Sequence, residues 1–139
     1  MNTKLIPELD VSDLVQSSKF YVEVLGFKVR YERPEEKFLF LDLEEISLML
    51  QEAAEPGRRF RTAPLEKPFG RGINLQIEVI DVSSIYSRLM KAGSGIVIPI
   101  EEKWYRKEHY EIGNRQFVVS DPDGYLLRFF TNLGERECK

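Results

Sequence analysis

The sequence contains one cysteine and one histidine, and this scarcity limits the chemistry open to the chain. Cys138 lies one residue from the end of the 139 residues, so no internal disulfide bond and no cysteine-based zinc site is expected. Any metal site would consist mostly of oxygen ligands. Neither a Ser-His-Asp nor a Cys-His arrangement has support, and we interpret His109 as a surface histidine.

The sequence also lacks an excess of basic charge and a long apolar run. The formal net charge is −3 and the isoelectric point is about 5.3, whereas nucleic-acid-binding proteins normally present a basic face. No run approaches the roughly 18 apolar residues of a membrane span. Residues 1–7 show no apolar segment of a signal peptide. These absences predict a cytoplasmic protein that binds neither nucleic acid nor membranes.

What the sequence does contain fits a globular fold. Hydrophobic residues make up 42% of the chain and charged residues 31%, which is typical of a folded protein. A length of 139 residues favours one domain, or two small halves that share a core.

The first half predicts a strand, a helix and three further strands. Apolar and polar residues alternate over 5–11, as in a half-buried strand, and Asp13 can cap a helix that Gly26 ends. Further strands are predicted over 27–33, 38–43 and 46–51.

The second half repeats this order of elements. Residues 73–79 alternate cleanly, Asp81 precedes a second amphipathic helix, and Gly93 follows it. A strand is predicted over 96–100, and two closing strands flank a turn at Asp121–Gly124. The closing strands cover residues 117–120 and 125–130.

An offset of about 68 residues superposes the two halves, so we interpret the chain as an internal duplication. The predicted fold class is α+β, a single domain of two tandem βαβββ modules. Module one covers residues 5–52, a Pro- and Gly-containing linker 53–71, module two 72–131 and a C-terminal tail 132–139. Residues 101–113 are predicted to form a long aromatic loop.

Two motifs carry a resemblance to a known family. They are Ser18–Phe27, with its Phe-Tyr-Val-Glu-Val-Leu-Gly-Phe run, and Asn114–Phe130, with its Asp-Pro-Asp-Gly-Tyr turn. The chain resembles the vicinal oxygen chelate superfamily, which includes glyoxalase I, extradiol dioxygenases and the fosfomycin and bleomycin resistance proteins. The resemblance implies paired modules whose curved mixed sheets form a cleft with the helices outside, and a homodimer.

The resemblance also assigns four places at which metal-dependent members hold ligands. These places fall on Ile6, Gln51, Asn74 and Arg128. Isoleucine has no donor atom and arginine is a permanent cation, so we expect no metal and no other cofactor. The alternative is one divalent metal ion, held after a two-residue shift in register that would bring in Glu8.

The predicted ligand-binding residues combine one face of the strands with the aromatic loop. They are Glu8, Asp10, Met49, Gln51, Asn74, Gln76, Glu78, Trp104, Tyr105, Tyr110 and Arg128. Acidic groups beside flat aromatic rings suit a small organic ligand, in particular a cationic aromatic one. The same residues also have structural interpretations: solvated strand charges, an ion pair of Arg128, or a dimer contact of Trp104.

Three functions remain open from the sequence. The leading hypothesis is a metal-free dimer that binds or sequesters a small molecule, as bleomycin resistance proteins do, with no catalytic residues assigned. The first alternative is a metal-dependent lyase, isomerase or dioxygenase of the same superfamily. The second is a non-catalytic regulatory or partner-binding module.

Overall fold

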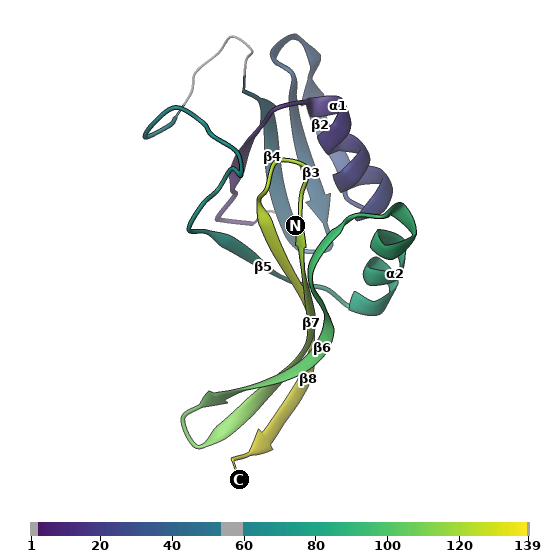
Figure 1. Ribbon diagram of the computed structural model, residues 1–139, viewed down its shortest axis with the longest axis vertical. Helices are drawn as coiled ribbons and strands as arrows, with labels where there is room; N and C mark the ends of the chain where they lie inside the picture. The colour runs from purple at the N-terminus through teal and green to yellow at the C-terminus, as the bar shows by residue number, and fades with distance from the viewer. Residues whose placement is uncertain (1–2, 54–59, 139) are drawn as a thin grey trace. The chain divides into compact units, whose positions relative to one another are not determined.

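The computed structural model describes residues 3–53 and 60–138, and the chain forms two compact units (Figure 1). The first unit consists of residues 1–69 with Pro122–Gly124, and the second of residues 70–121 with 125–139. Residues 54–59 of the predicted linker lie outside the described residues. The described remainder of the linker, 60–71, contains no helix or strand.

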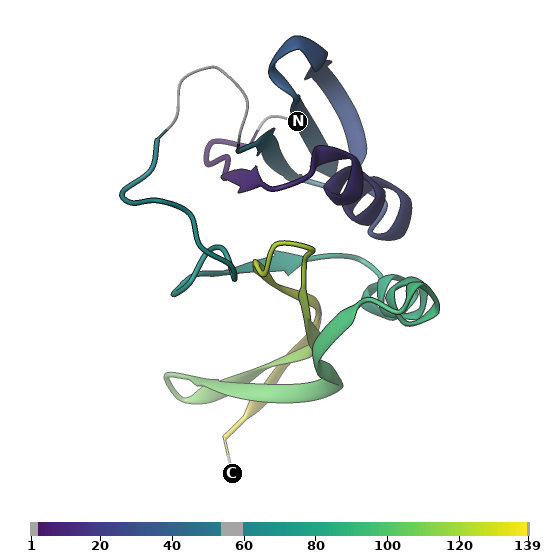
Figure 2. The same cartoon turned by 45° about the horizontal axis from the view of Figure 1, so that its top comes forward.

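The first unit is a four-stranded mixed sheet with one helical segment. Its strand order is β1-β4-β3-β2, with β1 parallel to β4 and the other neighbours antiparallel. Figure 2 shows the helical segment lying along one face of this sheet. The elements are β1 (Glu8–Val11), α1 (Leu14–Ser18), η1 (Lys19–Val24), β2 (Lys28–Arg33), η2 (Pro34–Glu36), β3 (Phe38–Leu43) and β4 (Ile46–Glu52).

The second unit repeats this topology. Its strand order is β5-β8-β7-β6, and β5 is parallel to β8. The identical order confirms the predicted pair of βαβββ modules. The elements are β5 (Asn74–Glu78), α2 (Val82–Ala92), β6 (Gly95–Lys107), β7 (Tyr110–Ser120) and β8 (Leu126–Glu137).

The matched aspartates cap the two helices, as their sequence positions predict. The Asp13 carboxylate accepts a hydrogen bond from the backbone N–H of Gln16 at 3.2 Å, and Asp81 accepts one from Ser84 at 3.1 Å. Each bond satisfies a backbone donor that the first helical turn leaves free. Gly93 ends α2 with φ of 66°, a left-handed conformation that glycine adopts at low cost.

The first helix differs from the regular helix that its spacing predicts. After Ser18 it continues as the π-helix η1, in which the N–H of Leu25 bonds the carbonyl of Phe20 at 3.0 Å. Phe20, Tyr21 and Leu25 are all buried in this arrangement.

Alternation along the strands separates a helix-facing core from the opposite sheet face. Val11, Leu41 and Leu50 are fully buried in the first unit, as are Phe117 and Leu127 in the second. Their neighbours along each strand point away from the helices. This opposite face of the second sheet carries the candidate site.

Three boundaries differ from the prediction. β1 begins at Glu8 rather than at residue 5, because Pro7 has no N–H to donate to a ladder and contributes only its carbonyl, to Met49 N at 2.9 Å. The predicted loop over 101–113 is instead a hairpin of β6 and β7 that turns at Glu108 and His109. The predicted tail is also partly strand, because β8 continues to Glu137.

Of the helices that the structure describes, none combines the length and the apolar character that a bilayer crossing needs.

Candidate ligand-binding site

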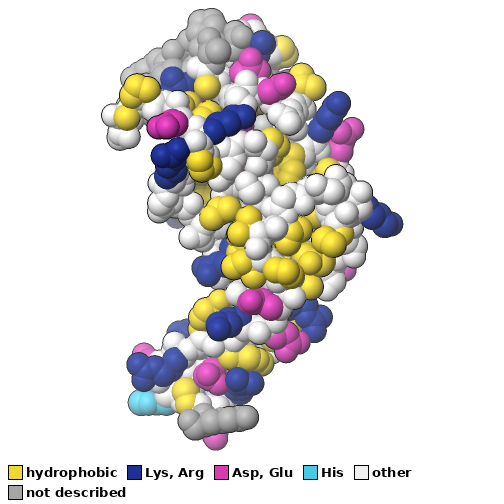
Figure 3. All heavy atoms as spheres, in the orientation of Figure 1, with side chains coloured by type: hydrophobic (Ala, Val, Ile, Leu, Met, Phe, Trp, Pro, Cys, Tyr) yellow, Lys and Arg dark blue, Asp and Glu magenta, His cyan; other side chains and the backbone are white. Residues whose placement is uncertain are grey.

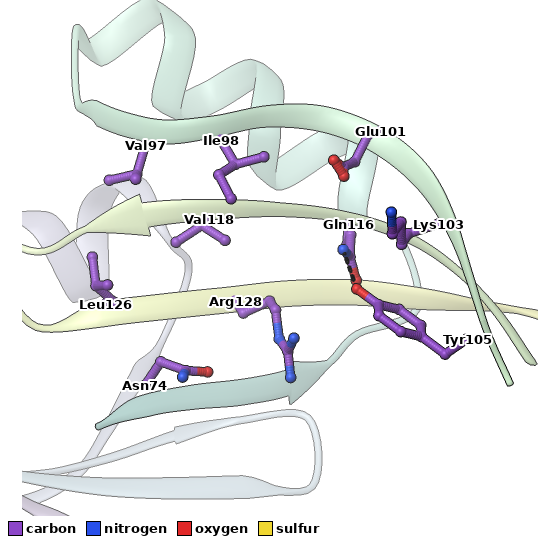
Figure 4. Close-up of a pocket in the computed structure, with 10 residues that line it drawn as sticks. All are labelled: Asn74, Val97, Ile98, Glu101, Lys103, Tyr105, Gln116, Val118, Leu126 and Arg128. Carbon is purple, nitrogen blue, oxygen red and sulfur yellow. Dashed lines mark hydrogen bonds between the residues drawn. The ribbon is translucent and has the colours of Figure 1, made fainter. Parts of the chain in front are cut away.

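A cavity of about 420 Å³ lies on the face of the second sheet that points away from α2 (Figure 4). All four strands of this sheet contribute to it. The lining residues are Asn74 from β5, Val97, Ile98, Glu101, Lys103 and Tyr105 from β6, Gln116 and Val118 from β7, and Leu126 and Arg128 from β8. The site therefore belongs entirely to module two.

The cavity has an apolar end and a polar end (Figure 4). Val97, Val118 and Leu126 lie at one end, with the amide of Asn74 at its margin near Leu126, and Tyr105 and the polar side chains of β6 and β7 lie at the other. The side chain of Arg128 lies between the two ends. This division suits a molecule with an apolar body and one polar group.

Arg128 is held against β5 by an amide. Its Nη2 atom donates a hydrogen bond to Oε1 of Gln76 at 2.6 Å, and the two residues are direct partners in the β5–β8 register. The Nε atom of Arg128 is buried and has no hydrogen-bond partner among the described residues. One edge of the guanidinium is thus fixed while other N–H groups remain to be used.

Tyr105 is positioned in a similar way by Gln116. The Nε2 atom of Gln116 donates to the Tyr105 hydroxyl oxygen at 2.7 Å. Gln116 is only 6% exposed, and its Oε1 atom has no partner within the described part of the chain.

The charged residues of the cavity are Glu101, Lys103 and Arg128. None of them forms an ion pair with another residue of the described ranges 3–53 and 60–138. The cavity contains two positive charges and one negative charge, so its net charge is positive. The charge of the module-two cavity therefore does not support the prediction of a cationic ligand.

Module two brings several of the predicted site residues together. Asn74, Tyr105 and Arg128 line the cavity, and Gln76 holds Arg128. Glu78 lies farther along β5, opposite Phe130, and does not line the cavity.

Module one places its four predicted residues on neighbouring strands. Glu8 is opposite Met49 and Asp10 is opposite Gln51 in the β1–β4 register. Asp10 forms an ion pair with Arg61 at 2.9 Å, which offsets its charge.

Gln51 is 5% exposed, and its Nε2 atom donates to the backbone carbonyl of Glu36 at 3.5 Å. The two modules are described separately. That the site residues of module one and those of module two contact the same ligand stays a prediction.

Trp104 and Tyr110 do not line the cavity. Because residues 101–107 are a strand, Trp104 points to the face opposite Lys103 and Tyr105. Its ring lies over Gly113, and the guanidinium of Arg136 is 4.0 Å from the ring centre. Tyr110 lies near the hairpin turn, with the Lys107 ammonium 5.9 Å from its ring centre.

Sequence reasoning missed Glu101 and Lys103 because it treated 101–113 as a loop, and it missed Gln116 because the closing strand was predicted to begin only at residue 117. Polar residues occupy both faces of 101–107, so no apolar period marks this strand in the sequence.

The residues at the family's metal-ligand places do not fit a divalent cation. In module two, Asn74 shares its cavity with the guanidinium of Arg128, which is a permanent positive charge and has no acceptor atom. In module one, Ile6 lies before β1 and has no donor atom. Hard divalent cations bind several oxygen ligands, usually including carboxylates. The described residues contain no group of three or more His, Cys, Asp or Glu side chains that could hold a metal ion.

Comparisons with known proteins agree with the fold. A sequence model of the Glyoxalase/Bleomycin resistance protein/Dioxygenase superfamily matches residues 7–129. Bleomycin resistance proteins from Geobacillus stearothermophilus and Staphylococcus aureus are each 29% identical over 137 residues, covering 92% of this chain and 96% of the relative.

Solved structures show the same fold. TioX from Micromonospora sp. ML1 superposes with a TM-score of 0.71 at 24% identity, covering 95% of this chain and 100% of that chain. An integron cassette protein from V. cholerae superposes with a TM-score of 0.70 at 17% identity, covering 94% of this chain and 95% of that one.

Proposed function

The chain belongs to the Glyoxalase/Bleomycin resistance protein/Dioxygenase superfamily, and we propose that within it this protein binds a small organic molecule and holds it without chemical change. The similarity to bleomycin resistance proteins over nearly the whole chain supports a binding role. The cavity of about 420 Å³ is within the usual range for small-molecule sites.

The main support for this proposal is the position of the Arg128 side chain in the wall of the cavity. Metal-dependent members of the superfamily place an anionic ligand at this position of the closing strand. A guanidinium there repels a divalent cation, and it can instead donate several hydrogen bonds to an organic ligand. The protein accordingly uses the cavity of module two for metal-free binding, and we propose that it does so as a homodimer.

Metal content and ligand binding test the proposal together. Protein purified without a His-tag and without chelators should contain no stoichiometric divalent metal by elemental mass spectrometry. A small-molecule library screened by thermal shift should then contain compounds that raise the melting temperature. A ligand at about 100 times its Kd adds about 2.7 kcal/mol to the unfolding free energy.

Two variants locate the site. Arg128→Met keeps an apolar stem but removes the guanidinium, and should lose the thermal shift. Arg115→Ala removes an exposed arginine of β7 that pairs with Glu102 at 3.0 Å, and should keep it. About one divalent ion per chain would contradict the metal-free function, and would redirect the work to lyase, isomerase and dioxygenase assays.

A further inference from the structure

Two hydrogen-bond donors of the cavity are oriented by side-chain amides, one from the buried Gln116 and one from the exposed Gln76. A tyrosine hydroxyl has one proton to donate and lone pairs that accept. Because Gln116 Nε2 already donates to the Tyr105 oxygen at 2.7 Å, the hydroxyl proton of Tyr105 must point elsewhere. No described residue accepts it, so it remains available to a ligand in the cavity.

Arg128 is oriented by its bond to Gln76. The 2.6 Å contact from Nη2 to Oε1 uses one of the five guanidinium N–H groups and fixes the plane of the group. Arg128 makes no other hydrogen bond within the described residues. The N–H groups that Gln76 does not use can donate two parallel hydrogen bonds, which is the geometry that a carboxylate accepts.

The balance of groups in the cavity favours an acceptor on the ligand. Lys103 adds a second positive charge, and Glu101 supplies the one negative charge. The unpartnered Oε1 of Gln116 is a neutral acceptor, and the amide of Asn74 adds one further acceptor oxygen and two N–H donors. Donors therefore outnumber acceptors, and the local charge is positive.

From these contacts, and resting on the proposed binding function, we propose that the cavity of module two recognises a carboxylate on an organic ligand. The carboxylate accepts hydrogen bonds from Arg128 and from the hydroxyl of Tyr105. The apolar body of the ligand lies against Val97, Val118 and Leu126 at the other end of the cavity. The apolar end distinguishes this site from one for a small inorganic anion, which would have no use for it.

A matched series of three probes tests the charge preference. The probes are 4-phenylbutanoate, 4-phenylbutanamide and 4-phenylbutylamine, which share an apolar body and differ in the end group. Each is titrated into the full-length protein and followed by amide chemical shifts. We expect the carboxylate to bind at least about tenfold more tightly than the amide, because hydrogen bonds to a charged group are stronger. The amine should bind most weakly.

Three variants assign the preference to the proposed donors. Arg128→Met should reduce the carboxylate-to-amide ratio by about tenfold, to near unity. Tyr105→Phe removes only the hydroxyl and should weaken carboxylate binding by about fivefold. Arg115→Ala should change neither value. The Tyr105 variant keeps the test decisive if Arg128→Met does not fold.

The possible outcomes separate this inference from the proposed function. If the amide or the amine shifts the cavity resonances at equal or lower concentration than the carboxylate, the carboxylate preference is wrong while small-molecule binding stands. If no probe shifts any resonance of the cavity, the carboxylate inference is contradicted, whereas the proposed function is contradicted only if the thermal-shift library also yields no ligand. If Arg128→Met and Tyr105→Phe both keep the carboxylate preference, the two donors are wrongly assigned.

Discussion

Asp42, at the end of β3, illustrates how neighbouring side chains set the charge of a single residue. Burial raises the pKa of its carboxyl, but hydrogen bonds from Arg30 at 2.7 Å and Ser47 at 2.6 Å lower it, and the pKa lies below its ordinary value. The same Arg30 guanidinium lies 4.5 Å from the ring centre of Phe40. The ionised carboxylate is therefore the form that stabilises this edge of the first sheet.

A lowered pKa in the folded state makes this contribution dependent on pH. It is fully present above the pKa of the unfolded chain and is lost as the pH falls through the folded pKa, so the window lies below about pH 4. Asp42→Asn should lower the unfolding free energy at neutral pH, and its difference from the wild type should shrink toward about pH 3. Chemical denaturation at both pH values measures this difference.

Glu45→Gln provides the control for Asp42. Glu45 lies in the turn between β3 and β4 and makes no ion pair or hydrogen bond with a described residue. Its substitution should leave the unfolding free energy nearly unchanged. A constant loss of stability for Asp42→Asn at every pH would show that the side chain acts through its shape rather than its charge.

At the scale of elements, the outer parts of β6, β7 and β8 form an extension that we call the hairpin arm: residues 101–107, 110–115 and 131–137. β5 pairs with β8 only as far as Phe130, so the arm has no fourth strand among the described residues. Charged pairs join its strands, with Glu102–Arg115 at 3.0 Å and Glu111–Arg136 at 2.9 Å. Figure 3 shows side chains of both signs interspersed along it.

Within the hairpin arm, the ring of Trp104 packs on Gly113 of the neighbouring strand. A Cβ atom added to Gly113 would lie 2.6 Å from two carbons of the indole ring, so the ring would have to move. Gly113→Ala should displace Trp104, shift its fluorescence to longer wavelength and destabilise the arm by about 1–3 kcal/mol. Trp104 is the only tryptophan of the chain, so the emission reports on this contact alone.

Gly95→Ala, in the strand β6 that carries Trp104, is the matched control. A Cβ atom at Gly95 has its nearest neighbours at 3.9 Å, an ordinary contact. The emission of this variant should equal that of the wild type. Unchanged emission in Gly113→Ala as well would mean that the indole does not pack on Gly113 in solution.

At the scale of the whole molecule, the chain passes from the second unit into the first at the turn Pro122–Gly124 and then returns. Within the first unit, the carboxylate of Asp123 accepts hydrogen bonds from the backbone N–H of Ser12 at 3.1 Å and from its hydroxyl. The ammonium of Lys67 lies 3.5 Å away. The Asp123 side chain is 1% exposed, and these donors satisfy its buried charge.

Removal of this carboxylate should destabilise the first unit. Asp123→Ala removes the charged acceptor of two hydrogen bonds from Ser12, at an expected cost of about 1–3 kcal/mol in unfolding free energy by chemical denaturation. Ser12→Ala should cost clearly less in the Asp123→Ala background than in the wild type, because the two residues share one interaction. Strictly additive losses would show that the two side chains do not interact in solution.

The sequence predicts much of the fold because repeated patterns are local. Alternation in the core strands, the capping positions of Asp13 and Asp81, and the turn at Asp121–Gly124 all depend on residues close together in the chain. The hairpin arm was missed because polar residues occupy both faces of its strands. Such strands have no apolar period and are held by pairing with their neighbours.

The sequence likewise predicts some residues of the candidate site and not others. Asn74 and Arg128 follow from the alternation of short strands and lie together as the duplication predicts. Trp104 and Tyr110 were placed by their aromatic character, and the strand that carries Trp104 turns its ring away from the cavity.

The sequence by itself determined the fold family, the duplication and the presence of a cation in the closing strand. These features depend on composition, spacing and residue type. Only the tertiary structure decided three contacts. Gln76 accepts a hydrogen bond from Arg128, Gln116 donates one to the hydroxyl oxygen of Tyr105, and Trp104 packs on Gly113. Such contacts join different strands, and their geometry depends on register and on strand length, which no local pattern specifies.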